Sequence, residues 1–227
     1  MAIIASLKLA SADDLKTLIS KVVISNFSEI ATFNYRLPQN ENVRTSPTVL
    51  MIVPGFNGDG EKFIQSNGWQ VFADCRNVIL ISPTFITDLE EIHSQRGYYY
   101  PALWSGKATM GALQQIELKY KVKIGKIYLF GFSAGAHFVH RFANWQPQKV
   151  AAFVAYSAGW WDAPVEELPN TPALIMCGEE DERYEPTLTF YQKGRELGCP
   201  WVWRSYPHTG HEITPQVVSM VQTFFRT

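Results

Sequence analysis

The sequence predicts an α/β fold, with a mostly parallel central sheet and helices on both of its faces. Short β-branched apolar runs recur along the chain and are nearly continuous in hydrophobicity, which is typical of strands buried on both faces. Segments of helical periodicity separate these runs, and this alternation is typical of parallel strands joined by crossover helices. The chain has 227 residues, of which 46% are hydrophobic, and it contains no repeat or flexible linker. We therefore expect a single domain over 1–227.

The elements expected along the chain follow this alternation. Buried strands are expected at 48–55, 77–83, 126–132, 150–159 and 172–178. The run at 200–207 alternates as an edge strand does, and the segment near 31–38 is expected to add antiparallel edge strands. Helices are expected at 106–121, 135–145, 186–197 and 214–226. Because ligands gather at the carboxyl ends of strands in such sheets, functional residues are expected just after the apolar runs.

Charge and composition exclude several classes of partner. The 20 basic and 21 acidic residues are scattered along the chain, so neither nucleic acid nor an anionic membrane surface is expected to bind. No apolar run is long enough to span a membrane. Residues 1–15 begin with an apolar stretch but have no basic residue before it, so no cleaved signal peptide is expected. The three cysteines show no CxxC spacing, which favours a reduced, cytoplasmic location.

Ser133 lies between two glycines directly after a predicted strand. The stretch from Gly131 to Gly135, GFSAG, fits the G-x-S-x-G pattern of a nucleophile elbow. A strand that turns sharply into a helix strains the turn residue, and the residues two positions away must be small to avoid collisions. Such a turn presents the serine hydroxyl above the positive end of the following helix. An ordinary glycine-bracketed turn is the alternative, but the strand before it and the amphipathic helix after it favour a nucleophile.

A serine nucleophile needs a base that accepts its proton. Of the five histidines, His211 lies in the loop between the last strand and the last helix, and it is the expected base. His208, in the same loop, is the alternative. His137 and His140 lie on the helix after Ser133 and are expected to be structural. No carboxylate near that pair completes a set of metal ligands, so no metal site is predicted.

The base in turn needs an acid that orients its imidazole. Four consecutive acidic residues, 179–182, follow the buried strand at 172–178. Asp181 is the expected acid, and the other three are expected to be solvated. Asp162, which follows the preceding strand, is the competing candidate.

Taken together, these residues resemble the α/β-hydrolase superfamily, in which the nucleophile, the acid and the histidine follow one another in that order. Ser133, Asp181 and His211 have this order, and the resemblance extends from about residue 30 to the end of the chain. It implies an oxyanion hole with one backbone N–H from Ala134 and a second from the loop at 54–58. Phe56 is the expected second donor, although the PGFNG sequence of this loop departs from the His-Gly-rich version of many lipases and esterases.

Two aromatic-rich excursions, near 84–105 and 159–171, are expected to form short, lid-like segments. The candidate substrate-binding residues in them are Tyr99, Trp104, Trp160 and Trp161, although packing in the core explains such aromatic residues equally well. Because the second excursion is short, an open site for small soluble esters is favoured.

The expected activity is that of a cytoplasmic serine carboxylesterase that uses an acyl-enzyme and neither cofactor nor metal. A peptidase or thioesterase with the same triad, or a catalytically silent protein that binds a small ligand, remains an alternative.

Overall fold

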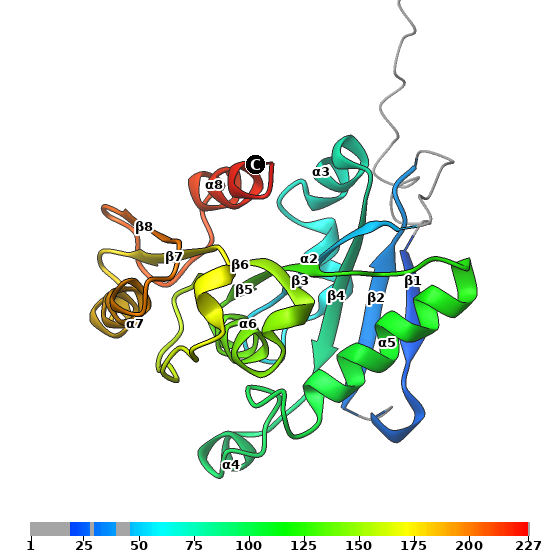
Figure 1. Cartoon of the computed structure of the whole chain (residues 1–227), viewed down its shortest axis with the longest axis horizontal. Coiled ribbons are helices and arrows are strands. Elements are labelled where there is room, and N and C mark those ends of the chain that lie inside the picture. Colours follow the sequence, from blue (N-terminus) through cyan, green and yellow to red (C-terminus); the bar gives the residue numbers. More distant parts are fainter. Residues whose placement is uncertain (1–18, 28–29, 40–45, 227) are drawn as a thin grey trace, which may run out of the picture.

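The computed structural model of the protein describes residues 19–27, 30–39 and 46–226, which form one eight-stranded sheet flanked by helices (Figure 1). The strand order is β1-β2-β4-β3-β5-β6-β7-β8. Strands β3 to β8 run parallel to their neighbours, whereas β1 and β2 form an antiparallel extension beside β4. The bounds are β1 Ile19–Val23, β2 Ala31–Arg36, β3 Thr48–Val53, β4 Val78–Phe85, β5 Ile127–Phe132, β6 Val150–Tyr156, β7 Ala173–Gly178 and β8 Trp201–Tyr206. The predicted mostly parallel α/β sheet is confirmed.

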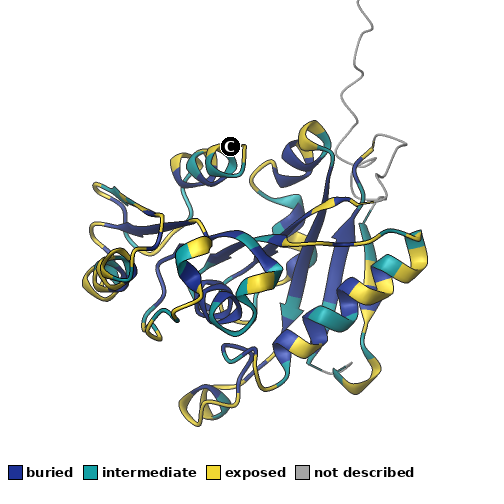
Figure 2. Cartoon of the chain, in the orientation of Figure 1, coloured by how far each residue is buried: buried dark blue, intermediate teal, exposed yellow. Residues whose placement is uncertain are grey.

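Helices cover both faces of this sheet, and the parallel strands between them are buried (Figure 2). One face packs against α5 (Ser105–Tyr120), α6 (Ala134–Trp145) and α7 (Tyr184–Glu196). The other packs against α2 (Gly60–Gln65), α3 (Trp69–Arg76) and α8 (Pro215–Phe224). Because successive strand residues point to opposite faces, Val49 and Met51 of β3 enter the first core while Leu50 and Ile52 enter the second.

Several short elements were not predicted from the sequence. The helices α2, α3 and α4 (Leu89–His93) have six, eight and five residues, too few for a clear helical period. Strand β1 buries only Val22, so it lacks the apolar pattern of the inner strands. Consequently β2, expected at the edge, lies one strand inward, while β8 does form the other edge. Short 3₁₀ turns lie at Ser25–Phe27, Pro147–Lys149 and Leu168–Asn170.

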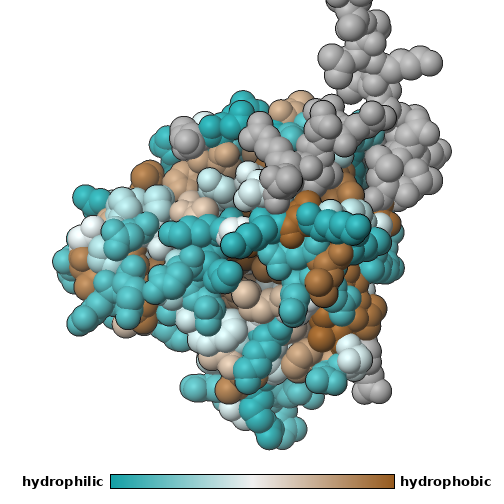
Figure 3. All heavy atoms as spheres, turned by 45° about the vertical axis from the view of Figure 1, so that its right-hand side comes forward, coloured by the Kyte–Doolittle hydropathy of each residue, from teal (hydrophilic) through white to brown (hydrophobic). Residues whose placement is uncertain are grey.

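The edge that carries β1 and α5 exposes apolar side chains among hydrophilic ones (Figure 3). Leu118 of α5 is 72% exposed and Val23 of β1 is 47% exposed. Among the helices of the described ranges, none is long and apolar enough to cross a membrane. The expectation about residues 1–15 concerns a part of the chain outside the described residues.

The parallel strands bring four loops to one edge of the sheet. Strands β3, β5, β7 and β8 all end there, and each is followed by one of the segments singled out from the sequence. These segments are the loop at 54–58, the turn at Ser133, the acidic run at 179–182 and the loop that carries His211. The candidate site is assembled at this edge.

Candidate active site

Ser133 forms a strained turn between β5 and α6. Its φ is 55° and its ψ is −116°, a backbone conformation that few residues with a side chain adopt. Its N–H donates to the carbonyl oxygen of Tyr156 at the end of β6, at 2.9 Å. A Cβ atom at Gly131 would lie 2.2 Å from the Gly135 carbonyl oxygen, and one at Gly135 would lie 2.1 Å from the carbonyl oxygen of Val53. Both flanking positions therefore exclude any side chain, as the G-x-S-x-G pattern predicts.

His211 contacts both Ser133 and Asp181. Its Nε2 lies 2.8 Å from Ser133 Oγ, and its Nδ1 lies 2.7 Å from Asp181 Oδ2. The imidazole also stacks on the ring of Phe132, with 4.8 Å between the ring centroids. The hydrogen bond to Ser133 is exposed, so a substrate can reach the hydroxyl from solvent. The three residues come from three different loops. Ser133 lies 78 positions before His211 in the chain, and Asp181 lies 30 positions before it.

Asp181 is held by Arg183 on the side away from His211. Its Oδ1 accepts hydrogen bonds from the Arg183 backbone N–H at 3.0 Å and from Nη1 of the same residue at 3.1 Å. Burial by itself would raise the pKa of this carboxyl group, but hydrogen bonds from His211, Arg183 and Ser157 outweigh it and hold the pKa below its usual range. The buried group therefore remains a carboxylate at neutral pH, with Oδ2 directed at the imidazole.

Several solved structures resemble this chain over nearly its whole length. A poly(3-hydroxybutyrate) depolymerase from Bordetella parapertussis matches with a TM-score of 0.72 and 19% identity, covering 96% of this chain and 94% of that one. An S-formylglutathione hydrolase from Staphylococcus aureus matches with a TM-score of 0.70 and 16% identity, covering 92% of this chain and 97% of that one. A ferulic acid esterase matches with a TM-score of 0.70 and 18% identity, covering 90% of this chain and 94% of that one.

The chain has the α/β-hydrolase fold. At these identities the similarity establishes the fold and leaves the activity to be argued from the site. No protein-family model matches the sequence, and a search of curated proteins finds no match.

On this α/β-hydrolase fold, the two alternative triad residues lie apart from the Ser133 hydroxyl. Both carboxylate oxygens of Asp162 accept hydrogen bonds from Arg141, each at 2.8 Å. The side chain of His208 is 94% exposed and lies 3.3 Å from Glu180. The geometry therefore joins Asp181 and His211, not Asp162 or His208, to Ser133.

The two histidines of α6 are buried and hydrogen-bonded, as expected for structural residues. His137 Nε2 accepts the N–H of Gly159 at 3.1 Å, and His140 Nε2 accepts the N–H of Asp162 at 3.2 Å. Burial lowers the pKa of His140 to about 3 and lowers that of His137 well below its usual value. Both rings are therefore neutral at physiological pH and anchor the segment after β6. Within 19–27, 30–39 and 46–226, no cluster of three or more His, Cys, Asp or Glu residues could hold a metal ion.

The two expected oxyanion donors, Phe56 and Ala134, lie in segments next to Ser133. Ala134 is the first residue of α6, and an N–H in the first turn has no acceptor within its own helix. The loop after β3 forms a tight turn in which the Gly58 N–H donates to the Gly55 carbonyl oxygen at 3.0 Å. A Cβ atom at Gly55 would lie 3.8 Å from the Cβ of Ser133, so this turn lies against the nucleophile. Phe56, at the centre of the turn, exposes 46% of its surface.

Tyr99 and Trp160 lie in one aromatic cluster close to the elbow. The Tyr99 ring stacks parallel to that of His137, with 4.7 Å between the ring centroids, and the centroid of the Trp160 ring lies 4.2 Å from that of His137. His137 is one helical turn beyond the nucleophile, because its N–H donates to the Ser133 carbonyl oxygen at 3.2 Å. Trp160 is 45% exposed and so remains available to a ligand, whereas Tyr99 is buried.

The other two candidate aromatic residues connect to this cluster only through intermediate rings in the described part of the chain. Trp161 stacks on Phe190 of α7 at 4.3 Å. Trp104 packs against Phe27 and Phe85, at 6.0 and 5.7 Å. Both tryptophans are partly buried against the core, and their part in substrate binding remains a prediction.

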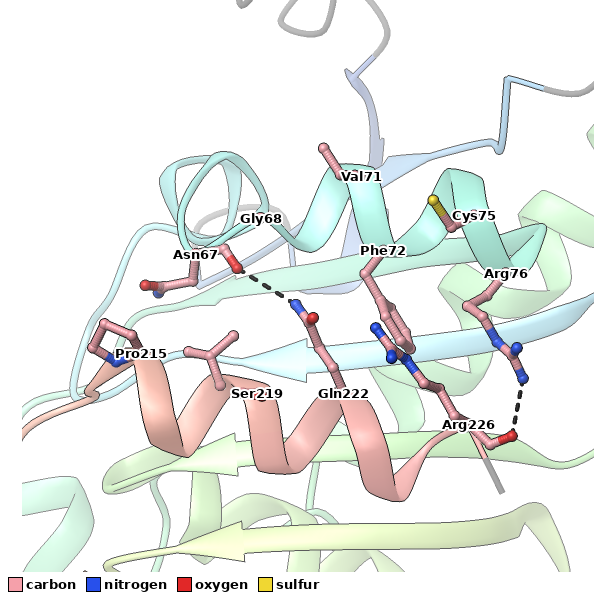
Figure 4. Close-up of a pocket in the computed structure, with 11 residues that line it drawn as sticks. Asn67, Gly68, Val71, Phe72, Cys75, Arg76, Pro215, Ser219, Gln222 and Arg226 are labelled. Carbon is pink, nitrogen blue, oxygen red and sulfur yellow. Dashed lines mark hydrogen bonds between the residues drawn. The ribbon is translucent and has the colours of Figure 1, made fainter. Parts of the chain in front are cut away.

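A groove of about 790 Å³ lies elsewhere, between α3 and α8 (Figure 4). Two hydrogen bonds cross it, from Gln222 to the carbonyl oxygen of Asn67 and from Arg76 to that of Arg226. No residue of the Ser133 site lines it. The lining residues are Asn67, Gly68, Val71, Phe72, Cys75, Arg76, Pro215, Val218, Ser219, Gln222 and Arg226.

Arg183, Ser157 and Asn57 are site residues that sequence reasoning missed. Arg183 acts on Asp181 across a turn and Ser157 acts on it from the segment that follows β6, and no motif encodes such contacts. Asn57 precedes a glycine, and an Asn-Gly pair favours a turn with positive φ. This pair was the sequence feature that could have identified a tight turn beside the nucleophile.

Proposed function

We propose that the protein is a serine hydrolase that cleaves small carboxylic esters through an acyl-enzyme intermediate. The observation that carries the proposal is the position of the His211 ring, which contacts the Ser133 hydroxyl through one nitrogen and the Asp181 carboxylate through the other. This is the geometry in which a histidine activates a serine. The names of the similar structures, an esterase, a depolymerase and a hydrolase, support a hydrolytic activity.

In the proposed first step, Ser133 Oγ attacks the ester carbonyl carbon while His211 Nε2 takes the hydroxyl proton. Asp181 holds the imidazole through Nδ1 and stabilises its positive charge. The tetrahedral intermediate carries its negative charge on the former carbonyl oxygen, and the N–H groups of Phe56 and Ala134 are the proposed donors to that oxygen. The intermediate collapses when the C–O bond to the alcohol breaks and His211 returns its proton to the departing oxygen.

In the second step, water replaces the alcohol. His211 takes one proton from the water, and the resulting hydroxide attacks the acyl carbon of the acyl-enzyme. Collapse of this second tetrahedral intermediate breaks the bond to Ser133 Oγ, and the proton on His211 restores the hydroxyl. The products are a carboxylic acid and free enzyme, so the cycle needs no cofactor.

The surroundings of Ser133 favour a small substrate with an apolar or aromatic group. The hydrogen bond between Ser133 and His211 is open to solvent, and the partly exposed Trp160 stands over the neutral ring of His137. We propose that Tyr99 and Trp160 form one wall of the substrate site. A cytoplasmic location remains part of the proposal, because Cys75, Cys177 and Cys199 are all free thiols.

Hydrolysis of p-nitrophenyl acetate tests the proposed function. We expect turnover by the wild-type protein and near-complete loss in Ser133→Ala and His211→Ala, with an unchanged circular dichroism spectrum in both variants. Equal rates in the wild type and both variants would remove the esterase proposal.

A further inference from the structure

The candidate oxyanion loop is a tight turn in which the Phe56 N–H group is left free. The Gly58 N–H closes the turn on Gly55, as described above. The Phe56 N–H has no acceptor in the described part of the chain. The turn therefore leaves the Phe56 N–H unused beside Ser133.

Asn57 keeps this turn in an unusual conformation. Its φ is 48°, in the left-handed region that asparagine tolerates better than most residues with a side chain. Gly58 supports the same shape, because a Cβ atom there would lie 2.7 Å from Pro54 Cβ. The direction of the Phe56 N–H depends on this backbone shape.

The Asn57 side chain binds the backbone of Thr87 in two places. Its Nδ2 donates to the Thr87 carbonyl oxygen at 2.8 Å, and its Oδ1 accepts the Thr87 N–H at 3.0 Å. The amide thus pairs with one residue of the segment after β4 as a neighbouring strand would. Two such bonds fix both the position and the orientation of the turn.

Thr87 is itself fixed by its neighbours. Its hydroxyl donates to Glu91 at 2.7 Å, and Glu91 takes part in the capping box with Asp88 that begins α4. A Cβ atom at Gly97 would lie 2.7 Å from Thr87 Oγ1, so the chain passes closely over this contact. The 86–98 segment is thereby attached to the oxyanion loop.

We propose that Asn57 is a positioning residue that holds the Phe56 N–H on the oxyanion by attaching the loop at 54–58 to Thr87. This inference rests on the proposed function. It assigns residues 86–98, part of the 84–105 excursion expected to be lid-like, a supporting role for the oxyanion hole. Loosening the attachment misdirects a transition-state donor while the triad and the substrate wall stay intact.

The test compares three variants by steady-state hydrolysis of p-nitrophenyl acetate. Asn57→Gly keeps the positive φ at no steric cost but removes both bonds to Thr87. Asn57→Asp keeps the acceptor for the Thr87 N–H but places an oxygen against the Thr87 carbonyl oxygen. Asn67→Gly is the matched control, because Asn67 also has a positive φ, of 54°, and lies on the α3 side of the molecule away from Ser133.

We expect Asn57→Gly to lower kcat by about tenfold or more, approaching the ~10²–10³ that follows loss of an oxyanion donor, with KM changed less than about twofold. Asn57→Asp should fall between this variant and the wild type, and Asn67→Gly should retain wild-type kcat. The pH dependence of kcat should keep its shape in Asn57→Gly, because the Asp181–His211 pair is untouched. Amide hydrogen exchange should accelerate at Thr87 and at 56–58 in Asn57→Gly alone.

Three results would overturn the inference. The first is a wild-type kcat in Asn57→Gly, and the second is an equal loss in Asn67→Gly. The third is a loss that appears in KM instead of kcat. If Asn57→Gly does not fold, Asn57→Asp decides the matter by the same criteria. A wild-type protein with no Ser133-dependent turnover would remove the proposed function and this inference together, whereas an active wild type with an equally active Asn57→Gly would remove this inference alone.

Discussion

Asp181 shows how single residues set the chemistry of the site. Its side chain is fully buried, and a buried carboxyl group normally takes up a proton because the charged form loses its hydration. Here the hydrogen bonds from Arg183 and His211 stabilise the charged carboxylate in place of the lost water. A charged acid behind the imidazole is what a serine hydrolase requires, because it stabilises the imidazolium that forms during attack.

Replacing Asp181 with asparagine tests this role. The substitution keeps the size of the side chain, but it removes the charge and favours the wrong tautomer of His211. We expect Asp181→Asn to lower kcat for p-nitrophenyl acetate by up to ~10⁴, with an unchanged circular dichroism spectrum. Turnover within about threefold of the wild type would argue against Asp181 as the acid.

The lowered pKa of Asp181 also predicts how stability depends on pH. A carboxyl group whose pKa is depressed in the folded state stabilises the protein above the unfolded pKa of about 3.9, and this contribution is lost as the pH falls through the folded value. The difference in free energy of unfolding between the wild type and Asp181→Asn should therefore decrease with acidification below about pH 4. Urea unfolding of both proteins at a series of pH values measures this difference in free energy. A difference that grows in acid would contradict the lowered pKa of Asp181.

At the scale of elements, the elbow is a junction of β3, β5 and α6. The first turn of α6 lies so close to the end of β3 that Gly135 contacts the backbone of Val53, and Gly131 contacts the backbone of Gly135. This close approach brings the loop after β3 beside Ser133. The glycines of the motif therefore allow the close packing of β3, β5 and α6 as well as the strained turn at the serine.

Gly135→Ala should force β3 and α6 apart. A Cβ atom 2.1 Å from a carbonyl oxygen cannot be accommodated without a backbone shift, and overpacking of this kind typically costs about 1–3 kcal/mol. We expect the free energy of unfolding to fall by that amount and activity to fall with it. Gly125→Ala is the control, since a Cβ atom at that position would have no neighbour within 4 Å, and it should change stability by less than about 0.5 kcal/mol. Equal effects in the two variants would show that the elbow tolerates a side chain.

The segment after β6 provides the second element-scale prediction. It is anchored to α6 by bonds from Gly159 and Asp162 to the two buried histidines, and it presents Trp160 to solvent. An aromatic contact is worth about 0.5–1.5 kcal/mol, so Trp160→Ala should raise KM for p-nitrophenyl benzoate by about two- to tenfold. KM for the acetate ester should change much less. Trp104→Phe, whose ring packs against Phe27 and Phe85, should leave both constants unchanged, and a matching change there would contradict the proposed wall.

For the whole molecule, the parallel part of the sheet could be predicted because its strands are buried on both faces and are therefore continuously apolar. The meeting of Ser133, Asp181 and His211 could be predicted because parallel strands end at one edge, so that residues following different strands meet there. Strand β1 could not be predicted, since it buries one side chain and depends on β2 for its pairing. The bonds of Asn57 to Thr87 join positions 30 residues apart and leave no periodic trace in the sequence.

The central claim is that the whole fold serves to make one hydroxyl, that of Ser133, a nucleophile. Labelling with a fluorophosphonate probe, followed by peptide mass spectrometry, tests this most directly. We predict a single adduct on Ser133, absent from Ser133→Ala and formed far more slowly in His211→Ala. A folded wild-type protein that takes no label, or takes it on another residue, would contradict the account.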